Sequence, residues 1–413
     1  APDGSLDENV FDIRQGVAIA LFIKSNAYKE HQVYNSNLYG KREEKYIWLS
    51  RHNILNVEYD KINPSSPYYF FVPRKTDEIQ RYLNWPQIKN IFPVNGVGMT
   101  TARDDFVIDE SKYNLLNRIL AFKHSNLDDE GLHNAFNIRV KKGWNIRRAW
   151  NDLQKIDDAE MSSYIERVLY RPFDIRFIFY HSAIVWRTVN KVVRHMFKDN
   201  LGLITSRQMD KSGIQPVFIT NTIIDAHSIT SATSISYLFP LYLYPDEEEL
   251  NFFNQTEQKR EPNIDQTIFL KLQEVYDQQI SPEQLLQYIY AVLFSPLYQQ
   301  TYADFLKFDF PRVPFTADSA LFQQMAALGK RLVDLHLLRS PELDQPIARF
   351  EGQGEDLTIT TPKYDPKTNR VWINPTHYLE GIPPEVWQYQ IGGYQVLDKY
   401  LKARKGSSLE DPR

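Results

Sequence analysis

The chain has 413 residues, too many for one ordinary hydrophobic core, so two or three domains are expected. Its net charge of −4 excludes a polycation, so any contact with nucleic acid has to come from a local basic surface. Cysteine is absent and no apolar run could span a membrane, which excludes disulfides and thiolate metal sites and suits a reducing cytoplasm.

The first hundred residues combine strand and helix patterns with a connector. Residues 16–24, GVAIALFIK, form a near-continuous apolar run, which predicts a strand covered on both faces, with residues 32–40 as its partner. Residues 41–49, KREEKYIWL, have helical character. Prolines then recur from residue 64 to residue 93 and predict turns and a connector.

The middle of the chain alternates short strands with few helices. Apolar spacing predicts helices at residues 111–123 and 151–168. Residues 190–197, NKVVRHMF, are also helical, with Asn190 as the possible N-cap. Strands are predicted at residues 174–180 (DIRFIFY), 201–208 (LGLITSRQ), 216–220 (PVFIT) and 234–245 (SISYLFPLYLYP).

The last part of the chain follows a polar, acidic stretch, residues 246–266, which is the best candidate for a linker. Two strong helices are predicted after it, within residues 281–306 and 317–338. Ser281 and Asp318 stand where their N-caps should be. The end mixes short strands such as RVWIN, residues 370–374, with a final helix within residues 392–405.

No motif amounts to a complete catalytic constellation. Residues 63–71, NPSSPYYFF, resemble the Asn-Pro-Pro-Tyr signature of amino-group methyltransferases, but Asn63 and Tyr68 are five residues apart, which favours a connector with aromatic packing. Gly96-Val97-Gly98 lacks the helix that a dinucleotide or AdoMet loop requires, so a turn is favoured. The sequence contains no P-loop, no nucleophile elbow and no HExxH zinc motif.

Residues 171–211 form a local basic segment, with eight Lys or Arg residues against three acids. Arginine suits bidentate contact with guanine or phosphate, and Trp186 adds a flat stacking surface. Internal salt bridges, such as one between Arg171 and Asp174, are the alternative, which is slightly favoured for Arg171 and Arg176. The residues for which contact with nucleic acid is favoured are Arg187, Lys191, Arg194 and Arg207, with Lys191, Arg194 and Lys198 spaced for a phosphate row on one helix face.

Arg103 and Asp104 form a second candidate group, on a predicted polar loop. Exposed Arg can read guanine, and Asp can accept a hydrogen bond from cytosine. A local salt bridge explains the pair equally well. The candidate DNA-binding residues are Arg103, Asp104, Trp186, Arg187, Lys191, Arg194, Lys198, Arg207 and Gln208; no catalytic or metal-binding residue is assigned.

Seven blocks of the sequence together resemble the C-terminal part of Type ISP restriction–modification enzymes. They are NVFDIRQGVAIALFIK, LYGKREEKYIWL, YRPFDIRFIFYHSAIVWR, DNLGLITSRQ, YLFPLYLYP, YIYAVLFSPLYQQTYADFLKFDFPRVPF and IGGYQVLDKYLKARKG. In that family a nuclease and a helicase-like motor precede an adenine methyltransferase, and a target-recognition domain ends the polypeptide. The methyltransferase, motor and nuclease motifs are missing here, so the resemblance implies recognition of DNA rather than catalysis by this chain alone.

The resemblance also implies an α+β architecture. Residues 1–60 would be the last strands of a Rossmann-like methyltransferase sheet, and residues 61–262 a β-rich target-recognition core. Residues 263–345 would be a helical section and residues 346–413 a closing α/β piece. No cofactor is expected in this chain; AdoMet, and ATP with Mg, are expected only for the full-length enzyme.

The expected function is sequence-specific recognition of double-stranded DNA as a specificity domain in the cytoplasm. The expected partners are duplex DNA and the upstream methyltransferase and motor segments of the same polypeptide, with no membrane. Two alternatives stay open: a self-sufficient AdoMet-dependent adenine methyltransferase, with its cofactor at residues 95–98, and a module that docks other subunits. Binding of AdoMet would favour the first, and a stable complex without DNA binding the second.

Overall fold

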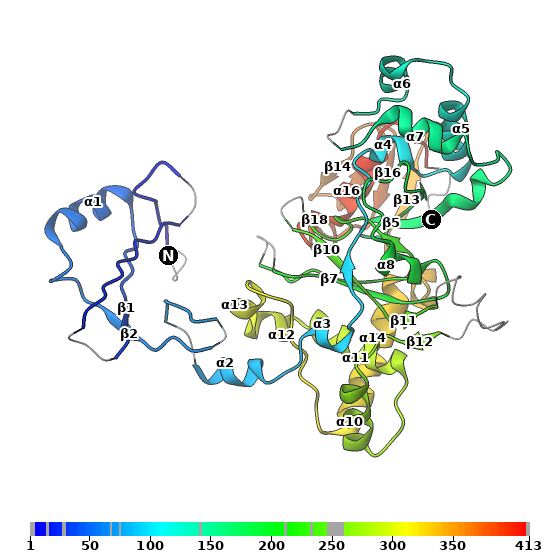
Figure 1. Cartoon of the computed structure of the whole chain (residues 1–413). Helices are drawn as coiled ribbons and strands as arrows, with labels where there is room; N and C mark the ends of the chain where they lie inside the picture. The colour runs from blue at the N-terminus through cyan, green and yellow to red at the C-terminus, as the bar shows by residue number, and fades with distance from the viewer. Residues whose placement is uncertain are drawn as a thin grey trace. The chain divides into compact units, whose positions relative to one another are not determined.

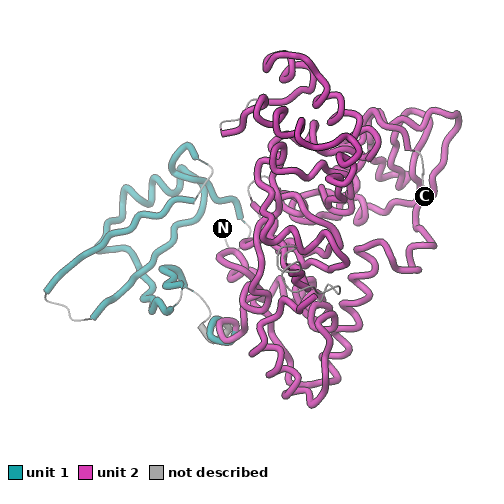
Figure 2. The backbone as a smooth tube through the Cα atoms, turned by 45° about the vertical axis from the view of Figure 1, so that its right-hand side comes forward, with its two compact units in different colours: residues 1–81 teal, residues 82–413 magenta. Residues whose placement is uncertain are grey.

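The computed structural model describes residues 5–13, 16–26, 30–66, 68–73, 76–139, 143–209, 213–231, 234–245 and 260–409. The chain is a mixed α+β protein that divides into two compact units, residues 1–81 and 82–413 (Figure 2). The division falls within helix α2 (Thr76–Leu83), and the boundary predicted at residue 60 stays a prediction. Among the described residues, no helix combines the length and the hydrophobicity that crossing a bilayer requires.

The first unit contains one helix and one pair of short strands. Helix α1 (Arg42–Arg51) confirms the helix predicted from KREEKYIWL. Strand β1 (Val33–Asn35) pairs antiparallel with β2 (Asp60–Ile62). The Lys45 ammonium, which is buried, lies 2.6 Å from Oδ1 of Asp7 and ties the helix to the preceding segment.

The strand predicted at residues 16–24 is wrong for this chain. None of these described residues lies in a strand, and the side chains of Ile19 and Phe22 are 92% and 81% exposed. The predicted partner, residues 32–40, contributes β1, which pairs with β2 instead. An apolar run becomes a strand only where another strand offers hydrogen bonds and a sheet face to cover, and the first unit offers neither to this run.

The second unit is built around two four-stranded sheets. The first has the order β3-β10-β7-β8 and is antiparallel throughout. Its two central strands align Leu238 with Ile204, and β7 and β8 are buried along their whole length. Burial on both faces explains their continuous apolar sequences. The strands are β3 (Gly96–Val97), β10 (Ser236–Pro240), β7 (Gly202–Ser206) and β8 (Val217–Thr220).

The second sheet has the order β4-β6-β5-β9 and holds the segment around residues 165–179. Here the helix predicted at residues 151–168 is wrong: helix α7 ends at Leu153, and the chain enters strand β5 at Ile165. Pairing of β5 with β6 outweighs the helical spacing of the sequence. The strands are β4 (Ile108–Asp109), β6 (Asp174–Phe179), β5 (Ile165–Arg171) and β9 (Ile223–Ile224), with β9 parallel to β5.

Helices pack beside this second sheet and close its core. Phe106, Phe122 and Phe136 meet edge to face, and the predicted helix at residues 111–123 is α5, capped by Ser111. The helices are α4 (Asp104–Val107), α5 (Lys112–Lys123), α6 (Asp129–Ala135) and α7 (Ile146–Leu153), with the 3₁₀ turn η1 (Met161–Tyr164) leading into β5 (Figure 1).

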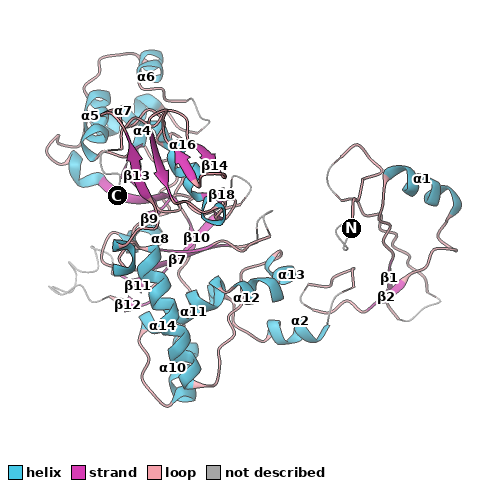
Figure 3. Cartoon of the chain, turned by 180° about the vertical axis from the view of Figure 1, so that it is seen from behind, coloured by secondary structure: helices cyan, strands magenta, loops and turns pink. Residues whose placement is uncertain are grey.

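A helical section follows residue 260, and Figure 3 shows its two longest helices side by side. Ser281 and Asp318 cap them as predicted. They approach so closely that a Cβ on Gly329 would lie 1.9 Å from the Gln287 carbonyl oxygen. The helices are α10 (Gln266–Tyr276), α11 (Pro282–Phe294), α12 (Pro296–Thr301), α13 (Ala303–Leu306) and α14 (Ser319–His336). Residues 246–259 of the predicted linker lie outside the described residues.

The C-terminal piece has its own sheet, in the order β13-β16-β15-β14, and a small core around Ile359, Val371 and Leu401. Its last helix, α16 (Val396–Ala403), confirms the helix predicted at the end. The remaining elements are α3 (Ile88–Ile91), α8 (Asn190–Val193), η2 (Arg194–Met196), β11 (Tyr242–Leu243), β12 (Glu261–Pro262), η3 (Pro341–Asp344), β13 (Arg349–Gly352), β14 (Lys363–Asp365), β15 (Arg370–Trp372), β16 (His377–Glu380), α15 (Pro384–Trp387), β17 (Gln390–Ile391) and β18 (Tyr394–Gln395).

Candidate nucleic-acid interface

Two segments that are distant in sequence lie side by side at Thr100 and Arg187. The Thr100 amide donates to the Arg187 carbonyl at 3.0 Å, and the Arg187 amide donates back at 2.9 Å. The Arg187 side chain is exposed, with its guanidinium carbon 4.7 Å from the centre of the Trp186 ring. The backbone of Arg187 is therefore fixed, while its exposed charge lies beside the half-buried Trp186 ring.

The turn after Arg187 is strained. Val189 has φ +51°, and a left-handed conformation is costly for a β-branched residue, by about 1–2 kcal/mol. The Tyr180 hydroxyl holds the turn by donating to the Thr188 carbonyl at 2.6 Å. On the facing segment, Ala102 has φ +62°. Strained backbone persists where its surroundings enforce it, and it concentrates at binding sites.

The predicted helix at residues 190–197 is shorter than expected. It consists of α8 and the 3₁₀ turn η2, and it ends at Met196. Asn190 is its first residue rather than its cap, which is Val189. Lys198 lies beyond it in a bend, with its ammonium 5.4 Å from the centre of the Tyr244 ring. The expected row of three cations on one helix face is therefore wrong, because the helix ends before the third.

Lys191 and Arg194 nevertheless share one concave surface. They line a hollow of about 310 Å³ together with His195, Tyr244 and Glu261. Lys191 is exposed, and Arg194 is half-buried. Inside the hollow's wall, Nδ1 of His195 accepts a hydrogen bond from the Tyr244 amide at 3.0 Å. The concavity presents two cations, one carboxylate and an aromatic ring.

Arg187 and Lys191 stand out by their lack of anionic partners. Among the residues that the structure describes, neither side chain has an ion-pair partner, and both are exposed. An exposed cation without a carboxylate keeps its charge available to a ligand. These two residues thus combine exposure with the absence of an ion pair in the described part of the chain, whereas the exposed Arg207 is paired with Asp309.

Arg207 and Gln208 lie elsewhere, at the end of β7. Nε of Arg207 is 3.0 Å from Oδ1 of Asp309, and the Gln208 amide donates to the Phe308 carbonyl at 3.3 Å. Burial acts to raise the pKa of Asp309, but hydrogen bonds from Gln87, a backbone amide and Arg207 hold it below its ordinary value. The ion pair with Asp309 ties Arg207 to the helical section. Part of its guanidinium stays accessible, because the side chain is 59% exposed.

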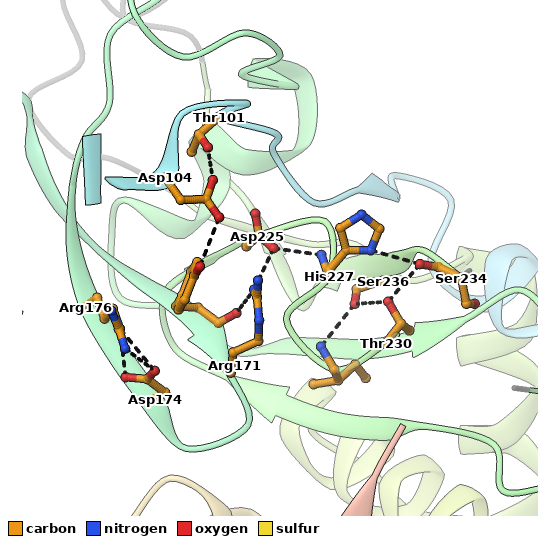
Figure 4. Close-up of polar contacts among 12 residues, drawn as sticks. Thr101, Asp104, Arg171, Asp174, Arg176, Asp225, His227, Thr230, Ser234 and Ser236 are labelled. Atoms are coloured by element: carbon orange, nitrogen blue, oxygen red, sulfur yellow. Dashed lines mark hydrogen bonds and ion pairs between the residues drawn. The ribbon is translucent and has the colours of Figure 1, made fainter. Parts of the chain in front are cut away.

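The exposed position expected for Arg103 and Asp104 is wrong. Arg103 is only 5% exposed, and its guanidinium carbon lies 3.7 Å from the centre of the Trp144 ring. Asp104 is half-buried and accepts hydrogen bonds from Thr101 and, at 3.0 Å, from the Tyr170 hydroxyl (Figure 4). The loop folds back because its polar groups find internal partners, and no salt bridge joins the two described residues.

Arg171 and Arg176 form the internal ion pairs expected for them. Nη1 of Arg171 lies 2.9 Å from Oδ1 of Asp225, and Nη2 of Arg176 lies 3.0 Å from Oδ2 of Asp174 (Figure 4). The partner predicted for Arg171 was Asp174, which is wrong: the buried Asp174 instead binds Arg176 and Arg404. These guanidiniums brace the β5–β6 hairpin, so most of the positive charge in the stretch IERVLYRPFDIR is structural.

The turn predicted at Gly96–Gly98 is wrong, because the first two residues form a strand and the third packs closely against a neighbouring segment. Gly96 and Val97 form β3, and a Cβ on Gly98 would lie 2.6 Å from the Asp225 carbonyl oxygen. The glycines allow the strand to pack against its neighbours. Within the described ranges, no group of three or more His, Asp or Glu side chains is arranged to hold a metal ion.

Sequence reasoning missed Trp144 and Tyr244. Trp144 stacks under Arg103 and donates to the Ala183 carbonyl at 2.9 Å, which links it to the segment that ends at Arg187. Tyr244 lies beside Lys198 and in the hollow. Trp144 was missed because it is distant in sequence from the basic segment. Tyr244 was missed because its surroundings in the sequence are those of an ordinary strand residue.

The model of one family, the Type ISP C-terminal specificity domain, matches residues 90–412. Because the match covers most of the chain, the protein belongs to this family. This confirms the family predicted from the seven sequence blocks. No curated protein matches the chain.

Solved structures share the fold at low identity. A nuclease-deletion mutant of the Type ISP restriction–modification enzyme LlaGI, in complex with a DNA substrate mimic, is 22% identical with a TM-score of 0.60, over 92% of this chain and 35% of that one. A DrdV–DNA complex is 21% identical with a TM-score of 0.64, over 92% and 39%. The ATP-dependent Type ISP enzyme LlaBIII bound to DNA is 17% identical with a TM-score of 0.60, over 84% and 23%. The chain thus spans well under half the length of each.

Proposed function

We propose that this chain recognises a target sequence in double-stranded DNA as the specificity part of a longer restriction–modification polypeptide. The family is named for a specificity domain, and three structures of similar fold are DNA complexes. The observation that carries the proposal in this chain is the fixed Thr100–Arg187 ladder. The ladder presents the exposed Arg187 guanidinium beside Trp186, and helix α8, which begins just after the strained Val189, carries Lys191, which has no ion-pair partner among the described residues.

A salt titration tests this proposal. The chain is titrated with fluorescent duplexes of random and of enriched sequence, and the dissociation constant is measured at two salt concentrations. We expect binding that weakens steeply with salt, because lysine and arginine displace counterions from phosphate. Lys191→Ala should weaken binding to every duplex alike. Binding without salt dependence would count against a DNA surface built on these cations.

The rest of the full-length enzyme belongs to the same proposal. Residues 1–60 would end a methyltransferase sheet, with residues 61–262, 263–345 and 346–413 as the recognition core, its helical section and the closing piece. AdoMet, and ATP with Mg, would bind to the upstream segments of the polypeptide, in the cytoplasm. Support comes from the relatives, which are much longer than this chain, and from the unpaired apolar residues 16–24.

A further inference from the structure

The buried Arg103 side chain is anchored on one side only. Its Nη1 donates to the Thr101 carbonyl at 3.1 Å and to the Ile184 carbonyl. Its plane lies against the Trp144 ring. Both anchors belong to the segments that meet at the Thr100–Arg187 ladder, so the guanidinium is held rigidly beside the candidate interface.

The opposite edge of the same guanidinium is made by Nε and Nη2. Nε and Nη2 of Arg103 are buried, and neither has a hydrogen-bond partner in the described part of the chain. The N–H groups of these two nitrogens point the same way, and together they form the fork that grips a phosphate or carboxylate with two parallel hydrogen bonds. A buried donor without an acceptor is costly, and here two stand side by side.

The charge of Arg103 is also uncompensated. Burial alone lowers its pKa to about 10. Arg171 and Arg404 are half-buried, and there Asp225 and Asp174 raise the pKa values against the effect of burial. No carboxylate among the described residues does the same for Arg103. A buried cation of this kind is stabilised by any anion that reaches it.

Residues next to Arg103 and Trp144 in the sequence are partly exposed. Ala102 and Asp104, on either side of Arg103, are half-buried, and Asp105 is exposed. Trp144 is half-buried too, and Gly143 before it is exposed. Solvent thus reaches residues next to Arg103 and Trp144 in the sequence, and Ala102 among them has a strained backbone.

We propose that the Nε–Nη2 fork of Arg103 receives one phosphate of the bound duplex, next to Arg187, when the residues over it move aside. This inference rests on the proposed function and assigns one contact within it. Phosphate is favoured over a guanine edge because it supplies both the anionic partner and the two hydrogen-bond acceptors that the guanidinium lacks among the described residues. The contact adds to affinity for all sequences and positions the duplex against the ladder.

The test compares Arg103→Met and Arg103→Lys with the wild-type chain. Both variants should bind every duplex about tenfold more weakly or worse, with a slope of log affinity against log salt smaller by about 0.9 for Met. Lysine keeps the charge but loses the fork, so its slope should stay near wild type. The thermal midpoint of Arg103→Met should fall no further than that of Arg312→Met, because each variant loses two hydrogen bonds to backbone carbonyls. Arg312→Met is the matched control: its Nη1 also donates to two carbonyls and its Nε is also unpartnered, and it should keep wild-type affinity and slope.

Three outcomes overturn the inference. Unchanged affinity of Arg103→Met would show that the fork contacts no DNA. A loss confined to one target sequence, with an unchanged salt slope, would assign the fork to a base edge instead of a phosphate. A fall of affinity that is accompanied by a larger fall of the thermal midpoint than Arg312→Met shows would mark Arg103 as structural. Failure of the wild-type chain to bind any duplex would instead contradict the proposed function.

Discussion

The cationic side chains of this chain fall into two groups, those that form internal ion pairs and those that are exposed. Arg171 and Arg176 are enclosed by aspartates, whereas Arg187 and Lys191 are exposed without carboxylate partners in the described part of the structure. Sequence spacing suggested the structural role for the first pair, because aspartates stand nearby. It failed for Arg103, since the stacking partner Trp144 is 41 positions away and only the fold brings it close.

Three substitutions separate base contacts from phosphate contacts at the residue scale. Arg187→Ala and Arg207→Ala should each reduce binding to the specific sequence by about 1–3 kcal/mol, because a guanidinium reads guanine through two hydrogen bonds. Lys198→Ala should weaken binding to all sequences alike. The measurement is the dissociation constant for specific and random duplexes. If all three variants bind as the wild type does, the DNA-binding surface lies elsewhere.

At the scale of elements, strong local signals were sufficient for the helices but not for every strand. Caps at Ser281 and Asp318 and the amphipathic pattern predicted α11 and α14 correctly, since both signals are contained in neighbouring residues. The helix predicted at residues 151–168 was wrong because strand β5 forms by pairing with β6, and a local sequence pattern does not encode that pairing. The same holds for residues 16–24, whose pairing partner is not among the described strands.

The contact of helix α14 with the first sheet predicts a pH dependence of stability. His336 stacks on Phe218, and burial lowers its pKa from 6.5 to about 4. In the unfolded chain it takes up a proton below pH 6.5, whereas the folded chain resists until about pH 4. Stability from neutral His336 is therefore complete above pH 6.5 and is lost as the pH falls toward 4, by up to about 3 kcal/mol.

His336→Gln tests this directly. Urea denaturation at pH 7 and pH 4.5 should show a smaller loss of unfolding free energy for the variant than for the wild type, because Gln has no proton to gain. His31→Gln, at an exposed position, is the control and should match the wild type at both pH values. An equal acid-induced loss in His336→Gln and the wild type would refute a buried neutral imidazole.

At the scale of the whole molecule, the two units differ in how much they bury. Among the described residues from 5 to 73, Lys45 is the only buried one, while the second unit has an extended apolar core. A segment of this composition gains stability only by covering its apolar side chains. The described part of the first unit therefore lacks a buried apolar core like the one that stabilises the second unit.

This difference has a measurable result. The chain should bind the dye ANS strongly, and removal of residues 1–60 should lower the dye signal several-fold while the main unfolding transition keeps its midpoint. Ile19→Lys with Phe22→Lys should lower the signal in part, as both side chains are exposed. A truncated chain with the same dye signal would place the exposed apolar surface in the second unit.

The bond between Arg404 and Asp174, 2.6 Å long across 230 positions, gives the C-terminus an unexpected influence. Replacing Arg404 would leave the nearly inaccessible Asp174 carboxylate, at the start of β6, with one guanidinium fewer. Arg404→Ala should therefore loosen the β5–β6 hairpin, although residue 404 is distant from it in the sequence.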